Sequence, residues 1–158
     1  MSELRQTLVI DEWLWHDIRG ENGEEKQKEA FDFLQCICKV CDKIACMENS
    51  PFVKKFWEIS KIAGEKKELR DIIIFFIRKF IYNSLKCEIY PYEVSQPDLN
   101  IKPDDAYIYS LYDKIESTQK KIITTDTGLI EEFKKNNIKV YHRDEFIRKY
   151  LQKCENIP

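Results

Sequence analysis

The stretch KIITTDTGLIEEFKKNNIKVYHRDEFI, residues 121–147, decides the fold. It opens with a β-branched, apolar run that ends at Asp126, which is typical of a buried parallel strand. Three further elements are expected after this run: a helix at 128–136, a strand at 138–141, and a helix at 145–152 capped by Asp144. This alternation of strand and helix predicts a parallel sheet with helices on both faces.

The rest of the chain shows the same alternation. A short apolar run at 7–10 ends in Asp11, and Ser50 followed by Pro51 is a typical helix start. The other expected elements are helices at 24–40, 51–64, 68–85 and 104–116, a strand at 43–47, and a short strand at 88–90 within a proline-containing loop. The sequence therefore predicts an α/β fold, a three-layer α/β/α sandwich with a central parallel sheet, as a single domain spanning residues 1–158.

Composition limits the classes of protein to consider. The chain has 158 residues, of which 43% are hydrophobic, and this excludes a disordered protein. Its formal charge of -2 comes from 28 acidic and 26 basic residues, which neither indicates nor excludes nucleic-acid binding. The sequence shows no signal peptide and no apolar run long enough to span a membrane, so we expect a cytoplasmic protein without a membrane partner. The six cysteines are expected to be reduced, apolar fillers rather than zinc ligands.

Carboxylates stand where a parallel sheet places its sites. Asp11 and Asp126 each follow a strand, and Asp104 and Asp105 stand at a helix start. Ligand sites of open α/β sheets form beyond the carboxyl ends of the strands. Carboxylates gathered there would repel each other unless a cation lay among them, and oxygen ligands select Mg²⁺ or Mn²⁺. The alternative interpretation is local: Asp104 and Asp105 as helix caps, and Asp126 as the start of a turn.

Three segments together resemble the PIN-domain family, whose fold is an α/β/α sandwich. They are LVIDEWLW at 8–15, KPDDAYIYSLY at 102–112, and the stretch at 121–147. The resemblance implies that Asp11, Asp105 and Asp126 bind Mg²⁺ or Mn²⁺. Asp104, Thr124 and Thr125 are expected to support these acids.

The family also carries a glutamate on a helix in its first half. The passage KIACMENSPFVKKFWEISK, residues 43–61, resembles that region, and Glu58 is the residue we expect in this role as metal ligand or general base. Glu48 is the alternative. The competing interpretation of Glu58 is a helix-surface acid near Lys54 and Lys61 at helical spacing.

The resemblance implies a metal-dependent endoribonuclease that acts on RNA. Many small members are toxins of toxin–antitoxin pairs or form dimers, so a protein antitoxin and a homodimer are expected partners. The chain departs from the family after Asp11, where Glu12 and Trp13 replace a small polar residue and an asparagine. This departure leaves open a degenerate PIN module that binds RNA or protein without cutting. A phosphatase-like or receiver-like enzyme and an interaction protein with exposed aromatic helices also remain open.

Overall fold

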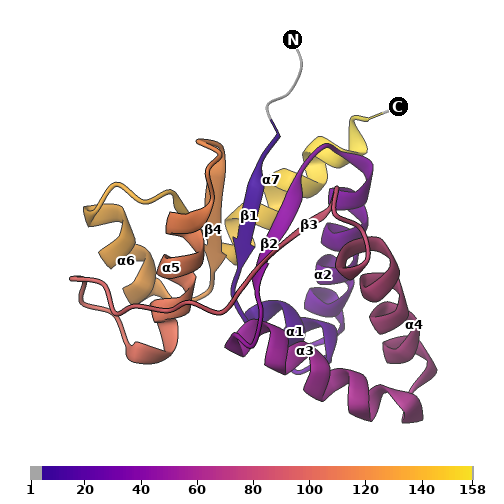
Figure 1. Ribbon diagram of the computed structural model, residues 1–158. Helices are drawn as coiled ribbons and strands as arrows, with labels where there is room; N and C mark the ends of the chain where they lie inside the picture. Colours follow the sequence, from indigo (N-terminus) through magenta and orange to yellow (C-terminus); the bar gives the residue numbers. More distant parts are fainter. Residues whose placement is uncertain (1–4, 158) are drawn as a thin grey trace.

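The computed structural model describes residues 5–157, so the ends of the expected domain, residues 1–4 and 158, lie outside the described residues. The fold is α/β, with five parallel strands in the order β3-β2-β1-β4-β5 (Figure 1). The strands are β1 (Thr7–Ile10), β2 (Lys43–Met47), β3 (Cys87–Tyr90), β4 (Lys120–Thr124) and β5 (Val140–His142). The predicted parallel sheet is confirmed, and β1 lies at its centre.

Helices cover both faces of this sheet, which gives the three layers expected from the sequence (Figure 1). On one face, α5 (Ala106–Lys114) packs on β1, β2 and β4, and α6 (Thr127–Lys135) packs on β4 and β5. The other face carries α1 (Trp13–Ile18), α2 (Glu24–Lys39), α3 (Pro51–Ile62), α4 (Lys67–Phe76) and α7 (Arg143–Glu155). In the described part of the chain, no helix is both long and apolar enough to traverse a bilayer.

Short helical turns complete the chain and explain where the expected boundaries shift. A 3₁₀ turn at Ala63–Glu65 follows α3, a π-helical turn at Ile77–Ile81 extends α4, and a 3₁₀ turn at Pro103–Asp105 leads into α5. The helix expected at 68–85 therefore ends at Ile81. Beyond it, the carbonyl of Asn83 accepts hydrogen bonds from the backbone N–H groups of Lys86 and Cys87, which turns the chain into β3.

Two expected boundaries near the C-terminus are wrong for local reasons. The N–H of Ile138 donates to the carbonyl of Phe133, and Asn137 has a φ of 60°, so these residues close the end of α6 and β5 begins only at Val140. The cap expected from Asp144 is supplied instead by His142, whose ring Nδ1 accepts the N–H of Asp144.

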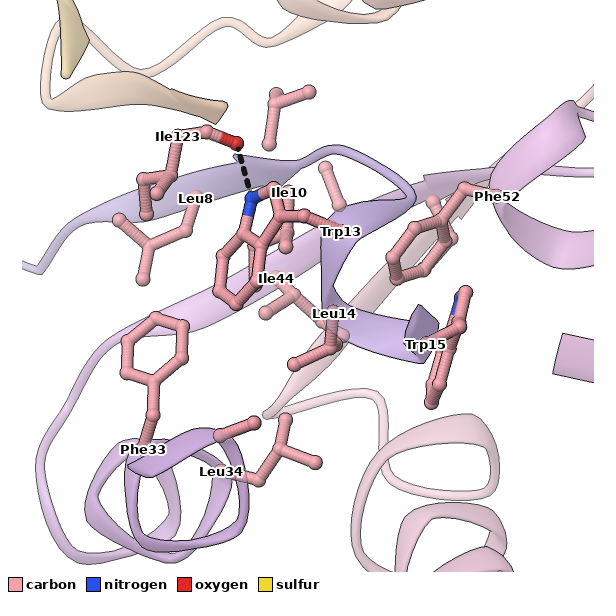
Figure 2. Close-up of a cluster of buried hydrophobic side chains, with 14 of the residues drawn as sticks. Leu8, Ile10, Trp13, Leu14, Trp15, Phe33, Leu34, Ile44, Phe52 and Ile123 are labelled. Carbon is pink, nitrogen blue, oxygen red and sulfur yellow. Dashed lines mark hydrogen bonds between the residues drawn. The ribbon is translucent and has the colours of Figure 1, made fainter. Parts of the chain in front are cut away.

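The core joins α1 to the middle of the sheet. All four residues of β1 are buried, and Trp15 lies against the rings of Phe52, Phe56 and Phe76. Figure 2 shows Trp13 reaching the end of β4, where its indole N–H donates to the carbonyl of Ile123 at 2.9 Å. This buried contact fixes the turn after β1 against β4.

The expectation that all six cysteines are reduced is wrong in this structure. Cys36 of α2 and Cys154 of α7 form a disulfide between two elements that are 118 residues apart in sequence. The other four cysteines are free, and Cys46 of β2 lies beside Cys87 of β3 in the core.

Candidate metal centre at the carboxyl ends of β1 and β4

The direction of the strand order reverses between β1 and β4. The chain passes from β1 to β2 and β3 on one side of the sheet, and then returns to β4 and β5 on the other. Asp11 follows β1 directly, and Thr125 and Asp126 follow β4. These residues therefore stand at the point where open α/β sheets place their ligand sites.

Three groups surround the carboxylate of Asp11: the backbone N–H of Glu12 and the hydroxyls of Tyr107 and Thr124. One carboxylate oxygen, Oδ1, accepts the N–H of Glu12 at 2.6 Å and lies 3.5 Å from the hydroxyl of Tyr107. The other, Oδ2, accepts the hydroxyl of Thr124 at 2.8 Å. These bonds fix the orientation of the first expected metal ligand.

Thr124 connects Asp11 with Asp126. Its hydroxyl donates to Asp11 and accepts the N–H of Asp126 at 3.1 Å, and its side chain is fully buried at the end of β4. Asp126 in turn caps α6, because its Oδ1 accepts the N–H of Leu129 at 3.1 Å. Asp126 therefore begins a helix as its cap rather than a turn, which was the local role expected for it, and the residue also lines the cavity described below.

The local interpretation fails for Asp105. Although Asp105 stands at the N-terminal boundary of α5, its side chain makes no capping hydrogen bond, and the 3₁₀ turn that contains Asp104 also has no side-chain cap. Asp105 is partly buried and lies close enough to Asp11 and Asp126 for their charges to act on it. Its carboxylate therefore faces other acids without the N–H partners that a cap would have.

Glu12 is also an acid of this site, although the sequence singled it out only because it differs from the PIN-domain pattern after Asp11. Its side chain is half-buried, and the charges of Asp11 and Asp105 act on it. Two positive partners, His16 and Lys55, act in the opposite sense. The signal in the sequence was its place directly after Asp11, at the N-terminal boundary of α1.

These carboxylates line one cavity of about 620 Å³. Its acidic residues are Asp11, Glu12, Glu21, Asp104, Asp105 and Asp126, and the exposed Thr125 also lines it. A neighbouring cavity of about 420 Å³ shares two of these acids and adds Lys102, Glu131, Glu132 and Lys135 to its wall. Two lysines therefore stand among the acids at the border of the first cavity, and Lys135 pairs with Glu132 at 3.9 Å.

Burial, together with the charges of neighbouring acids, raises the pKa of Asp11, Asp105 and Glu12. Burial raises the pKa of Asp11 and the charge of Asp126 adds to this rise, while the N–H of Glu12 and the hydroxyl of Thr124 oppose it. Burial likewise raises the pKa of Asp105, and Asp11 and Asp126 add to the rise. Burial, followed by the charge of Asp11, raises the pKa of Glu12. Mutual repulsion of this kind is relieved by a bound cation.

The donor set fits a hard divalent ion. The side chains are carboxylates and hydroxyls, which suit Mg²⁺ or Mn²⁺ rather than a soft metal. Within residues 5–157, no three His, Cys, Asp or Glu side chains already form a group that could hold a metal. The carboxylates therefore share a cavity without forming a closed ligand set.

Glu58 does not join these acids. Its side chain is 68% exposed on α3 and lies 3.8 Å from Lys55. Because α3 buries Phe52, Phe56 and Ile59 on its inner face, position 58 faces solvent, as the competing interpretation stated. Glu48, the alternative, is exposed and lines an apolar cavity beside Trp57 instead.

A buried ion pair anchors α1, which carries Glu12 at its start. Nε of Arg143 donates to Asp17 at 2.8 Å, and the two side chains are 1% and 2% exposed. The guanidinium also contacts Glu29 and stacks 5.4 Å from the ring of Trp13. Because α1, α2 and α7 all contribute to these contacts, the turn between β1 and α1 has little freedom to move.

Comparison with known proteins gave no match. No protein-family model matches this chain, and no curated protein is similar enough to it to be identified as a relative.

Proposed function

We propose that this protein is a metal-dependent endoribonuclease. One observation carries the proposal: Asp11, Asp105 and Asp126 line a single cavity at the switch point of a parallel sheet, with burial and mutual repulsion raising the pKa of the first two. An acidic cavity of this kind would repel a phosphodiester unless a cation were bound. The resemblance of the surrounding segments to the PIN-domain family supports the choice of RNA as substrate.

Each residue has a definite part in the proposed mechanism. Asp11, Asp105 and Asp126 would hold Mg²⁺ or Mn²⁺. Glu12 lines the same cavity and would take the role expected of Glu58, as metal ligand or general base. When bound, the ion would activate a water and neutralise charge on the scissile phosphate. Thr124 orients both Asp11 and Asp126 through its hydroxyl. The proton transfer is assigned to the group of carboxylates and not to one residue, because the charges of neighbouring acids act on both Asp11 and Asp105.

Two lysines near the acids are candidates for contact with an RNA backbone. Lys102 and Lys135 line the neighbouring cavity beside Asp105, Asp126, Glu131 and Glu132, and Lys135 pairs with Glu132. Lysines at such a border contact phosphates without reading sequence. We also propose, from the family resemblance alone, a toxin role with a protein antitoxin as partner, and a homodimer.

A second candidate function is a binding module that does not cut. Lys55 lies near Glu12, and its charge opposes the rise that burial and Asp11 cause in the pKa of that carboxyl. A lysine in this place supplies positive charge that a metal would otherwise supply. In this case the cavity would bind RNA or a protein partner, and Mn²⁺ would not change the outcome.

Cleavage of labelled single-stranded RNA tests the proposal. Wild type and Asp126→Asn are compared with Mn²⁺, with Mg²⁺ and with EDTA. The proposal expects metal-dependent cutting by the wild type and none by Asp126→Asn. Asparagine caps helices as well as aspartate does, so this variant removes the charge while it retains the start of α6. Cutting in EDTA, or cutting that survives the substitution, contradicts the proposal.

Two controls make this result specific. Glu58→Gln changes an exposed acid outside the cavity and is expected to cut as the wild type does. A wild-type protein that is folded and does not cut with either metal would favour the binding module. Gel-shift measurement of RNA binding with and without Mn²⁺ then separates the two candidate functions.

A further inference from the structure

A separate cavity, of about 290 Å³, lies between α7 and the first half of β4 at the β5 edge of the sheet. It shares no lining residue with the acidic cavity. Its lining includes three lysines and one acid: Lys121, Lys149, Lys153 and Glu145. The cavity therefore has a net positive lining, whereas the candidate metal centre is lined mainly by acids.

Lys121 and Lys153 of this cavity are close enough for their charges to act on each other, and Lys149 pairs with the exposed Glu145 at 3.1 Å. Burial lowers the pKa of Lys121, and the charges of Lys139 and Lys153 act in the same direction, while Asp42 opposes them. Asp42 is committed elsewhere, since its carboxylate accepts the backbone N–H of Gln6 at 2.9 Å and the hydroxyl of Tyr150 at 2.7 Å. An anion in the cavity would relieve the repulsion among the lysines.

Aromatic rings form the apolar part of the same cavity. Tyr141 of β5 is 37% exposed, and its ring lies 5.5 Å from Nζ of Lys121. Behind it, the rings of Phe146 and Tyr150 are buried and stacked at 5.4 Å. An exposed ring supported by buried rings, beside ammonium groups, is the combination with which proteins hold single-stranded nucleic acid: the base stacks and the phosphate pairs with the lysine.

One polar atom in this region lacks a partner. Oε1 of Gln6 is buried and accepts no hydrogen bond within the described residues, although the Nε2 group of the same side chain donates to Asp42 at 3.2 Å. Gln6 also lines the cavity. A nucleobase and the backbone of a peptide both carry N–H donors that can satisfy such an acceptor, so this atom indicates a ligand with an N–H group, and the supported ring of Tyr141 favours a nucleobase.

We propose that this cavity binds one nucleotide of a single-stranded nucleic acid, with the base on Tyr141 and the phosphate near Lys149 and Lys153. As a site for RNA substrate away from the acids, the inference rests on the proposed function. Lys121 and Thr124 are three residues apart on β4, about 10 Å along the strand, but Ile122, Ile123 and Thr124 are buried, so a bound strand that reached the acidic end of the sheet would pass over the helices that cover β4.

Binding of a fluorescein-labelled hexauridine, followed by anisotropy in EDTA, tests the inference without any cleavage. Tyr141→Ala is expected to weaken binding by about 5- to 100-fold, the range for loss of one base–aromatic stack, while Tyr141→Phe retains it. Lys149→Gln/Lys153→Gln is expected to weaken binding and to lower the slope of log affinity against log salt by about 1.4. These two lysines lie toward the surface, so this variant provides a test even if Tyr141→Ala fails to fold.

Matched controls and competitors decide the outcome. Tyr82→Ala removes an exposed ring elsewhere, Lys28→Gln/Lys61→Gln removes two other lysines, and both are expected to bind as the wild type does. Uridine monophosphate is expected to displace the probe at lower concentration than inorganic phosphate. Wild-type affinity in the Tyr141 and lysine variants would overturn the proposal. Displacement by hexaglutamate equal to that by hexauridine would also overturn it and assign the surface to an acidic peptide.

The test separates this inference from the proposed ribonuclease activity. If hexauridine binds as expected but no RNA is cut with either metal, the inference of a nucleotide site is supported and the catalytic proposal fails. If RNA is cut with Mn²⁺ while the Tyr141 and lysine variants bind and cut as the wild type does, the catalytic proposal stands and this inference fails.

Discussion

At the scale of single residues, Thr124 has the most specific position in the site. Its buried hydroxyl donates to Oδ2 of Asp11 and also accepts the N–H of Asp126. A supporting role was expected for both Thr124 and Thr125. The structure separates them, because Thr124 is buried between the acids and Thr125 is exposed on the cavity wall.

Thr124→Val tests this difference. Valine retains the shape of threonine but leaves the carboxylate of Asp11 and the N–H of Asp126 each without one hydrogen-bond partner. We expect a loss of about 1–3 kcal/mol in the free energy of unfolding, measured by urea denaturation. Thr125→Val is the matched control and is expected to stay close to wild type. Equal stability of the two variants would show that the hydroxyl of Thr124 does not support the acids.

The raised pKa of Asp105 predicts how stability depends on pH. Because burial, Asp11 and Asp126 all disfavour its ionised form in the folded protein, the stability that Asp105 contributes is complete below its ordinary pKa and is lost as the pH rises through the raised value. Asp105→Asn is therefore expected to have a higher melting temperature than the wild type in EDTA at pH 7. This advantage should shrink as the pH falls toward 4. An advantage that is absent at pH 7, or that grows on acidification, would contradict the electrostatic account.

At the scale of elements, α1 is positioned by its contact with α7. Arg143 and Asp17 form a buried pair, and Trp13 lies against the guanidinium while it donates to the carbonyl of Ile123. These contacts account for the pair Glu12–Trp13, which departs from the family pattern. Trp13 is a structural link between α1 and β4, and Glu12 is carried into the cavity at the start of that helix.

Arg143→Met removes one partner of this buried pair and leaves Asp17 without its cation. The expected cost is about 3–5 kcal/mol in unfolding free energy. Lys149→Met is the control, since its pair with Glu145 is exposed and is expected to contribute less than about 1 kcal/mol. A double-mutant cycle with Asp17→Asn measures the coupling directly. Additive effects of the two substitutions would contradict the role given to the pair.

β1, β2 and β4 were the most predictable strands, because their residues are largely apolar or β-branched, and Asp11 and Asp126 follow β1 and β4. The expected range 43–47 agrees with β2, and Ser50 caps α3 as predicted. Glu58 could not be placed from sequence, since its neighbours Phe56 and Trp57 are both aromatic although Trp57 is 44% exposed. Only the buried set Phe52, Phe56 and Ile59 shows which face of α3 is inward.

At the scale of the whole molecule, the site depends on bringing together three distant segments. Parallel pairing of β1 with β4 places Asp11 beside Thr124, and the start of α5 adds Asp105. The sequence predicted this meeting from topology, because carboxyl ends of parallel strands share one edge. It could not predict the disulfide, since pairing of cysteines 118 residues apart depends on how α2 packs against α7.

The bridge between Cys36 and Cys154 predicts a stability effect of reduction. The bridge links α2 to α7 and closes a loop of 118 residues in sequence. Its loss is therefore expected to lower the free energy of unfolding by about 2–4 kcal/mol and the melting temperature by several degrees. Melting curves with and without dithiothreitol measure this, with Cys41→Ser as a control at a free, exposed cysteine. Identical curves for wild type and Cys36→Ser/Cys154→Ser under oxidising conditions would show that the bridge does not stabilise the fold.

The claim on which the proposed function depends is that the acids at the ends of β1 and β4 hold a divalent cation. Titration of Mn²⁺ into metal-free protein, followed by the electron paramagnetic resonance of free Mn²⁺, tests it most directly. We predict that the wild type and Glu58→Gln bind Mn²⁺ with the same affinity. Asp105→Asn is expected to bind Mn²⁺ at least about tenfold more weakly, because even the loss of a residue that only orients a metal ligand lowers metal affinity by about that factor. A wild type that binds no Mn²⁺, or an Asp105→Asn variant that binds as the wild type does, would contradict the account.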